Sequence, residues 1–504
     1  MDVILSVDLG TTAIKTCLVD ASGHLLAGAS REYSLDTPGP DAVELDAETY
    51  WAAFREGVAE LLSRTAVDPR DIRALGISAQ GETLILADAA GRAIRPAIVW
   101  LDNRALAEAD ELAAEFGNDA AYRVTGQVSF VPTWPASKLL WLRRHEPATF
   151  DRAAWFLLIE DWFIARLTGR FVCEGSLVTS TMYWDLTTRR WWPEMLGYLG
   201  ITEDRLPEIR ESGEPVGPIL PAVARELGLD PGTIVCTGAL DQAAGAIGVG
   251  NIREGVFSEN TGAALAICAT VPAPVFDPGG QMPCHYHGIP GRYMEHTFTS
   301  GGMVLRWYRD AFCEPEVEAA RVQGRDAYDV LGELAAGVPP GSEGVIMLPH
   351  LQGAMAPEAN PRARGVFYGF TLHHTKAHFA RSIMEAIAFI VRRNVDVLGG
   401  LGIPVDEVRA LGGGARSRTW CQIKADVLGI PVVTTQIEEA ASLGAAILAG
   451  VAVGSFPSLE AAIDRMVAVR ERFEPDPANR ATYDTAYATY RDLYDSLVGV
   501  FERS

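Results

Sequence analysis

The stretch that decides the fold class is Val3-Ile4-Leu5-Ser6-Val7-Asp8-Leu9-Gly10-Thr11-Thr12, near the start of the 504-residue chain. An apolar run ends in a polar turn, and a second apolar run follows at residues 14–19. This alternation predicts two antiparallel strands joined by the turn. Residues 25–27 predict a third strand, and apolar side chains at three- and four-residue steps after Asp46 predict an amphipathic helix.

The polar turn between the first two strands carries groups that suit a phosphate ligand. Gly10 lets a ligand approach the backbone, and Thr11 and Thr12 offer hydroxyls and amides to phosphate oxygens. Asp8 can hold a hydrated Mg²⁺ ion, which a polyphosphate needs for charge balance. Lys15 adds a positive charge, although such a lysine is usually a solvated surface group. A polar hairpin turn without a ligand is the alternative.

The second half of the chain repeats this pattern. Val256–Glu259 leads into the turn Asn260-Thr261-Gly262, and an apolar run follows at 264–269. Further on, Arg409-Ala410-Leu411-Gly412 repeats Arg73-Ala74-Leu75-Gly76 letter for letter. A long helix is expected to begin near Thr375. These echoes predict two duplicated α/β lobes, with residues 1–248 in the first and 249–504 in the second.

Composition and charge exclude several functions. Lys and Arg number 43 against 65 Asp and Glu, so the formal net charge is −22. A surface this acidic repels nucleic acid and anionic lipid, and neither is an expected partner. The seven cysteines form no C-x-x-C pair, which suits a reducing compartment. No leader or apolar segment of about 18 residues is present, so we expect a soluble, cytoplasmic protein.

Asp241 is the candidate general base. It follows a predicted strand and opens the small-residue segment Gln242-Ala243-Ala244-Gly245. A carboxylate at the end of a strand beside a cleft is well placed to accept a proton from a hydroxyl, and phosphoryl transfer needs little more than alignment, charge relief and such a base. The alternative is that Asp241 only caps the following helix.

Other segments suggest ligand contacts. Gly412-Gly413-Gly414-Ala415-Arg416-Ser417-Arg418 joins a predicted strand to a helix, and such glycine-rich turns commonly admit a nucleotide against bare backbone. Trp134 could cover a sugar face. Cys284-His285-Tyr286-His287 lacks a partner pair with zinc spacing, so we interpret it as part of a sheet or cleft wall.

With these pieces in order, the whole chain resembles the FGGY family of carbohydrate kinases. The resemblance spans both halves, and so many matches in order are specific for the family. They comprise residues 8–12, 96–104, 137–141, 167–169, 241–245, 364–369, 412–417 and 441–446.

The resemblance implies two actin-like (ribonuclease H-like) lobes with an ATP and sugar cleft between them. It implies that Asp241 is the catalytic base, that Asp8 and Asp241 serve the magnesium ion, and that ATP is the phosphoryl donor. It further implies that the nucleotide contacts comprise Gly10, Thr11, Thr12, Lys15, Thr261, Gly262, Gly302, Gly413, Gly414 and, near the adenine, Arg418.

The segment Gln80-Gly81-Glu82-Thr83 departs from both main branches of the family. Xylulokinases usually carry Gln-Met-His-Gly there, whereas glycerol kinases carry Gln-Arg-Glu-Thr, so Glu82 and Gln242 match the glycerol kinases. Gly81 replaces their arginine, which is expected to open room for a longer acceptor. The expected acceptor contacts are Gly81, Glu82, Trp134 and Gln242.

The resemblance therefore favours an ATP-dependent kinase that phosphorylates a primary hydroxyl of a ketopentose such as xylulose. A glycerol or longer polyol kinase is the alternative within the same class. A sugar-binding regulator without catalysis is an alternative from another class, and the presence of Asp8 and Asp241 disfavours it. A homodimer is the common habit of the family.

Overall fold

The computed structural model describes residues 2–503, and the chain forms two compact units. The first unit contains the chain as far as Ile252 together with Val271–Met294 and Glu439–Ala468. The second contains Arg253–Thr270, Glu295–Glu438 and the chain from Val469 onward. The predicted lobes, 1–248 and 249–504, are continuous segments, whereas each compact unit is assembled from separate segments. The lobe boundary itself stays a prediction.

The first unit is built on a mixed sheet whose central strand is β1. The apolar residues of β1 are buried, and the strand pairs antiparallel with β2 and parallel with β6, as the opening hairpin predicts. The strand order is β14 (Pro215–Pro218), β15 (Ile234–Cys236), β6 (Ile72–Ala79), β1 (Val3–Leu9), β2 (Ala13–Asp20) and β3 (Leu25–Glu32), and β16 (Ala239–Leu240) also pairs with β6.

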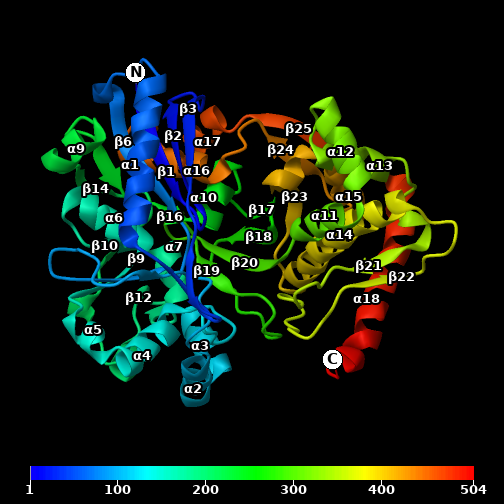
Figure 1. Ribbon diagram of the computed structural model, residues 1–504, viewed down its shortest axis with the longest axis horizontal. Helices are drawn as coiled ribbons and strands as arrows, with labels where there is room; N and C mark the ends of the chain where they lie inside the picture. The colour runs from blue at the N-terminus through cyan, green and yellow to red at the C-terminus, as the bar shows by residue number, and fades with distance from the viewer. Residues whose placement is uncertain (1, 504) are drawn as a thin grey trace. The chain divides into compact units, whose positions relative to one another are not determined.

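Helix α1 (Ala47–Arg64) packs on β2 and β3 of this sheet, as Figure 1 shows. It begins after Asp46, whose side chain accepts a hydrogen bond from the backbone N–H of Glu48 at 3.0 Å, so the predicted cap is confirmed. Gly57 permits the close approach, because a Cβ there would lie 2.7 Å from Thr16 Oγ1.

Two small-residue helices of the first unit pack backbone to backbone. Helix α16 (Ala440–Ala452) lies on β1 and β6 and also contacts α10 (Asp241–Gly248). A Cβ at Gly248 would collide with the carbonyl of Ala440, and one at Gly444 with the carbonyl of Ala244. This contact holds α10, and with it Asp241, rigidly against the sheet.

The second unit repeats the order and pairing of six strands of the first sheet. Strand β17 pairs antiparallel with β18 and parallel with β23, and β24 pairs antiparallel with β25 at the edge. The strand order is β20 (Tyr293–Ser300), β18 (Ala264–Val271), β17 (Gly255–Thr261), β23 (Val405–Leu411), β24 (Val432–Thr435) and β25 (Val469–Phe473). The predicted duplication of the α/β core is therefore confirmed.

Helices of the second unit pack together around the longest of them, α14 (Lys376–Gly400). Helix α14 begins after Thr375, as predicted, and contacts α15 (Arg418–Leu428) and α11 (Met303–Phe312). Helix α13 (Ala327–Ala336) lies against both α14 and α15.

Two expectations from the sequence concern the cysteines and membrane-spanning segments. All seven cysteines are buried free thiols. No helix among residues 2–503 combines the length and the apolar character needed to cross a membrane.

Candidate active site

The strand register of the first unit brings the two predicted carboxylates to one edge of the sheet. Asp8 on β1 lies opposite Ser78 on β6, and Ala239 on β16 lies opposite the same Ser78 from the other side. Asp241 follows two residues after Ala239, as the first residue of α10. Leu240 occupies the N-cap position of α10 without a side-chain capping bond, so Asp241 is not the N-cap residue of this helix.

The pKa values of the two carboxylates at this end of the strands differ from those of exposed aspartates. Asp8 Oδ1 accepts a hydrogen bond from Ser78 Oγ at 2.8 Å, yet burial raises the pKa of Asp8. Burial, reinforced by the charge of Asp8, raises the pKa of Asp241 to about 7. Two desolvated carboxylates that repel each other are hard oxygen ligands, so this donor set fits a divalent cation such as Mg²⁺.

The turn after β1 is held in shape by side chains from elsewhere in the first unit. The carbonyl oxygen of Gly10 accepts hydrogen bonds from Tyr33 Oη and from Gln80 Nε2. Thr11 Oγ1 accepts a hydrogen bond from Trp100 Nε1 at 2.8 Å. Thr12 is exposed at the tip, where its hydroxyl can meet a ligand.

Lys15 is engaged by an acidic partner. Its Nζ lies 2.7 Å from Glu439 Oε2, and both side chains are partly exposed. To make the predicted phosphate contact, Lys15 would have to leave Glu439.

Glu82 lies in a strained loop supported by a buried lysine. Its φ of 54° is in the left-handed region, which non-glycine residues rarely adopt. Lys138 Nζ donates to the carbonyl oxygens of Glu82 and Val99, each at 3.0 Å. Burial raises the pKa of Glu82 and lowers the pKa of Lys138. The sequence predicts no role for Lys138, because nothing local indicates that its side chain is buried beneath this loop.

The other three predicted acceptor contacts, Gly81, Gln242 and Trp134, have different surroundings. A Cβ at Gly81 would lie 3.1 Å from Leu240 Cδ1 and 3.4 Å from Ser180 Oγ. The extra room expected at Gly81 stays a prediction. Gln242 follows Asp241 on α10 and is half-buried. Trp134, half-buried at the start of α4 (Pro135–His145), donates its indole N–H to the carbonyl of Ser129 at 2.9 Å.

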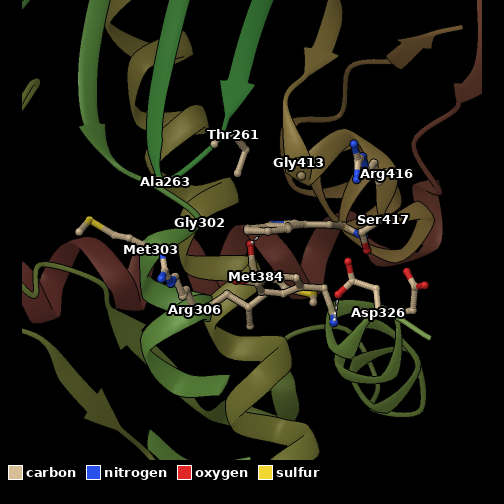
Figure 2. A pocket seen from close by; sticks show the side chains of 16 residues that line it. Thr261, Ala263, Gly302, Met303, Arg306, Asp326, Met384, Gly413, Arg416 and Ser417 are labelled. Atoms are coloured by element: carbon tan, nitrogen blue, oxygen red, sulfur yellow. Dashed lines mark hydrogen bonds between the residues drawn. The ribbon is translucent and has the colours of Figure 1, made fainter. Parts of the chain in front are cut away.

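The second unit contains a separate cavity that encloses about 350 Å³. Figure 2 shows Thr261 and Gly413 above the cavity in this view and Arg306 and Asp326 below it. Apolar surface from Leu305, Met384 and Trp420 can cover a flat heterocycle. The predicted contacts that line the cavity are Thr261, Gly262, Gly302, Gly413 and Gly414.

Bare backbone forms one wall of this cavity. A Cβ at Gly302 would lie 2.5 Å from the carbonyl oxygen of Gly262, and one at Gly414 would lie 2.7 Å from Thr261 Cβ. Glycine is therefore required at both positions for the second turn and the strand-to-helix connection to meet. Such a glycine-lined cradle fits the phosphates and sugar of a nucleotide.

A buried ion pair lies next to the turn Asn260-Thr261-Gly262, at the end of β17. Lys424 Nζ donates to Glu259 Oε1 at 2.6 Å and to Thr261 Oγ1 at 2.9 Å. Neither charged side chain has any exposed surface. The pair ties α15 to the end of β17, a connection of 165 residues that local sequence patterns do not reveal.

Arg418 does not lie among the residues that line the cavity. Its guanidinium forms an ion pair with Glu471 at 2.6 Å and is 76% exposed. Ser417 and Arg416, one and two residues earlier, line the cavity instead. The turn after β23 is thus the predicted segment, but its arginine nearest to the cavity differs from the expected one.

Comparison with known proteins identifies the class and the family. The N-terminal domain profile of the FGGY family of carbohydrate kinases matches residues 3–248, and its C-terminal domain profile matches residues 261–453. The protein is a phosphotransferase of the sugar kinase class with an actin-like fold. It belongs to the FGGY family of carbohydrate kinases, which implies ATP as the phosphoryl donor.

Relatives and solved structures agree over the whole chain. The xylulose kinase of Bacillus subtilis is 31% identical over 495 residues, covering 98% of this chain and 97% of that protein. The autoinducer-2 kinase of Yersinia pseudotuberculosis is 30% identical, covering 99% of this chain and 96% of that protein. The crystal structure of a ligand-bound xylulose kinase from Lactobacillus acidophilus superposes with a TM-score of 0.91 at 28% identity, covering all of both chains.

Proposed function

We propose that the protein transfers the γ-phosphate of MgATP to a primary hydroxyl of a ketopentose such as xylulose. The observation that carries this proposal is the convergence of Asp8, Ser78 and Asp241 at one sheet edge, with a pKa of about 7 for Asp241. A base with a pKa near neutrality is substantially deprotonated at neutral pH and still binds a proton strongly enough to accept one. The names of the xylulose kinase relatives supply the acceptor.

In this proposal Asp241 accepts the proton of the acceptor hydroxyl, and Asp8 holds the magnesium ion. When bound, the metal ion neutralises charge on the phosphates and helps to align the transferred group. Ser78 orients Asp8 through its hydrogen bond, and α10 keeps Asp241 in place against α16. The glycine cradle of the second unit binds the nucleotide, with Thr261 and Gly262 next to its phosphates.

In the same proposal the acceptor lies against Glu82, Gln242 and Trp134. Glu82 can accept hydrogen bonds from sugar hydroxyls, and Lys138 fixes the loop that presents it. Replacement of such a polar partner costs several decades of selectivity, because the buried group is left unpaired.

A glycerol or longer polyol kinase is the second candidate. The strained, anchored position of Glu82 favours it, since this residue and Gln242 match the glycerol kinases.

The deciding experiment measures ADP release with MgATP across ketopentoses, aldoses, glycerol, four- to six-carbon polyols and autoinducer-2. A ketopentose that dominates kcat/KM by several decades supports the proposal. Turnover only with polyols moves the protein to the second candidate. If folded, ATP-binding protein turns over none of these acceptors, the proposed substrate class is wrong and a sugar-binding regulator without catalysis becomes the better interpretation.

A further inference from the structure

A turn in the second unit, Gly341-Ser342-Glu343-Gly344, has an unusual backbone. Its four consecutive residues have positive φ values of 80°, 50°, 50° and 96°. Ser342 and Glu343 carry side chains in a region that disfavours them. Such a conformation persists only where the surrounding structure imposes it.

Hydrogen bonds from the turn to helix α14 hold it in this conformation. The buried carboxylate of Glu385 accepts hydrogen bonds from the backbone N–H of Gly341 at 2.9 Å and from Ser342 Oγ at 2.7 Å. Arg381 Nε donates to the same carboxylate at 2.8 Å. The turn is therefore anchored on the side of α14, and the side chain of Glu343 is directed toward the segment just before the helix and its first turn.

Two imidazoles meet the carboxylate of Glu343 there. His373 Nε2 lies 3.0 Å and His378 Nε2 lies 2.9 Å from the same oxygen, Glu343 Oε2. One donor atom from each of the three residues lies within 4.8 Å of the other two. Zn²⁺ binds imidazole nitrogen and carboxylate oxygen at about 2.0–2.2 Å, so tetrahedral ligation needs donors roughly 3.3–3.5 Å apart. A small adjustment of these side chains reaches that geometry.

The groups around the cluster suit metal ligation. His378 Nδ1 accepts a hydrogen bond from the backbone N–H of Thr375 at 3.1 Å and also lies 3.1 Å from Thr375 Oγ1. Ligation through Nε2 requires the other tautomer of His378, in which Nδ1–H donates to Thr375 Oγ1, because a ligating histidine generally donates its second ring N–H to an acceptor. His373 and Glu343 are partly exposed, which leaves a path for an ion and a position for water.

His374 differs from its two neighbours. Its Nδ1 accepts a hydrogen bond from the backbone N–H of Thr371 at 2.7 Å, and its Nε2 lies 3.3 Å from the main-chain carbonyl of Glu343. It therefore braces the backbone of the turn and offers nothing to the carboxylate oxygen that the other two imidazoles share.

We propose that Glu343, His373 and His378 form a binding site for one divalent transition-metal ion of the Zn²⁺ class, with a fourth position taken by water. Imidazole ligands select Zn²⁺, Co²⁺ or Ni²⁺ over Mg²⁺, so this site is distinct from the magnesium site of the kinase reaction. The ion fastens the strained turn to the start of α14, the helix whose Met384 lines the nucleotide cavity. The site is structural and does not depend on the proposed acceptor.

The test uses the full-length protein after removal of metal with a chelator and exchange into metal-free buffer. Zn²⁺ is titrated against a chromogenic indicator, and Co²⁺ is followed by its visible absorption. We expect one equivalent to bind, with affinity at least about tenfold weaker in His373→Ala and Glu343→Gln. His24→Ala, at an exposed histidine of the first unit, is the control and should bind as the unsubstituted protein does.

A second readout separates ligation from folding. Zn²⁺ above its Kd should raise the Tm of the unsubstituted protein and leave that of Glu343→Gln unchanged. The proposal is overturned if Zn²⁺ does not bind, if binding survives in Glu343→Gln combined with His373→Ala, or if His24→Ala weakens binding as much as His373→Ala. Because these readouts contain neither ATP nor acceptor, failure here says nothing about the kinase reaction.

Discussion

Lys424 Nζ lies 2.6 Å from Glu259 Oε1, and both side chains are wholly shielded from solvent. Lys424 also donates to Thr261 Oγ1, and Thr261 Oγ1 in turn lies 2.5 Å from Glu259 Oε2. The turn that lines the nucleotide cavity is thus held by a closed triangle of charge-assisted hydrogen bonds. A triangle of this kind is fully satisfied only when all three members are present.

Replacement of Lys424 by Met should weaken both stability and nucleotide binding. Removal of one partner from a buried ion pair leaves an uncompensated charge, which costs about 3–5 kcal/mol. We expect a lower Tm and a raised KM for ATP, because Thr261 loses its support. Thermal unfolding and initial-rate kinetics at varied ATP measure the two effects.

The double variant Lys424→Met with Glu259→Gln serves as the control. Without the orphaned carboxylate, it should recover part of the stability lost in the single variant. A double variant that is as unstable as the sum of the two singles would contradict the coupling.

Replacement of Asp241 by Asn should remove most of the turnover while leaving nucleotide binding intact. Loss of a general base lowers turnover by roughly 10²–10⁴-fold. The glycine cradle lies in the second unit and does not include Asp241, so ATP affinity measured by calorimetry should change little. Near-normal turnover in this variant would show that another group removes the proton.

The same substitution should make the protein more stable at alkaline pH. Burial raises the pKa of Asp241 in the folded protein to about 7, whereas in the unfolded chain it is about 3.9. The folded state therefore binds more protons between these values, and wild-type stability falls as pH rises through this window. Because Asp241 is only half-buried, we expect a difference of about 1–2 kcal/mol.

The measurement compares the Tm of the two proteins at about pH 5 and about pH 8, on either side of the folded-state pKa. The advantage of Asp241→Asn should be small at the lower pH and larger at the higher one. An advantage that is the same at both pH values would mean that ionisation of Asp241 does not oppose folding.

Replacement of Lys138 by Met should impair acceptor binding selectively. It leaves the carbonyls of Glu82 and Val99 without their donor, so the strained loop that carries Glu82 loses its anchor. We expect the KM for the acceptor to rise by about tenfold, as for the loss of a hydrogen bond to a charged group, with the KM for ATP unchanged. Lys376→Met, at an exposed lysine of the second unit, is the matched control and should change neither constant.

Local sequence patterns predicted the framework of the protein well. The two hairpins, the helices after Asp46 and Thr375, and the duplicated sheets follow from apolar periodicity and turn residues, which act over a few positions. Asp8 and Asp241 could be singled out because each stands at the end of a strand. The register that joins them to Ser78 could not be read from any one segment.

What escaped prediction depends on contacts between distant segments. Lys138, Lys424 and the Glu343 cluster function through partners that lie 30 to 165 residues away, and no local pattern encodes such distances. Arg418 stays a prediction as a nucleotide contact, while Arg416 and Ser417 of the same turn line the cavity. The segment 439–468 joins the first unit because its small residues fit α10, which only the folded contact reveals.

Replacement of Gly414 by Ala should raise the KM for ATP with little effect on the acceptor. The new Cβ would lie 2.7 Å from Thr261 Cβ, so the strand-to-helix turn and the second phosphate turn would be forced apart. Gly399→Ala is the control, because a Cβ there meets nothing within 4 Å and the position lies inside α14. It should keep normal kinetics and gain up to about 1 kcal/mol of stability from helix propensity. If Gly414→Ala and Gly399→Ala show the same KM for ATP, bare backbone at Gly414 is not what admits the nucleotide.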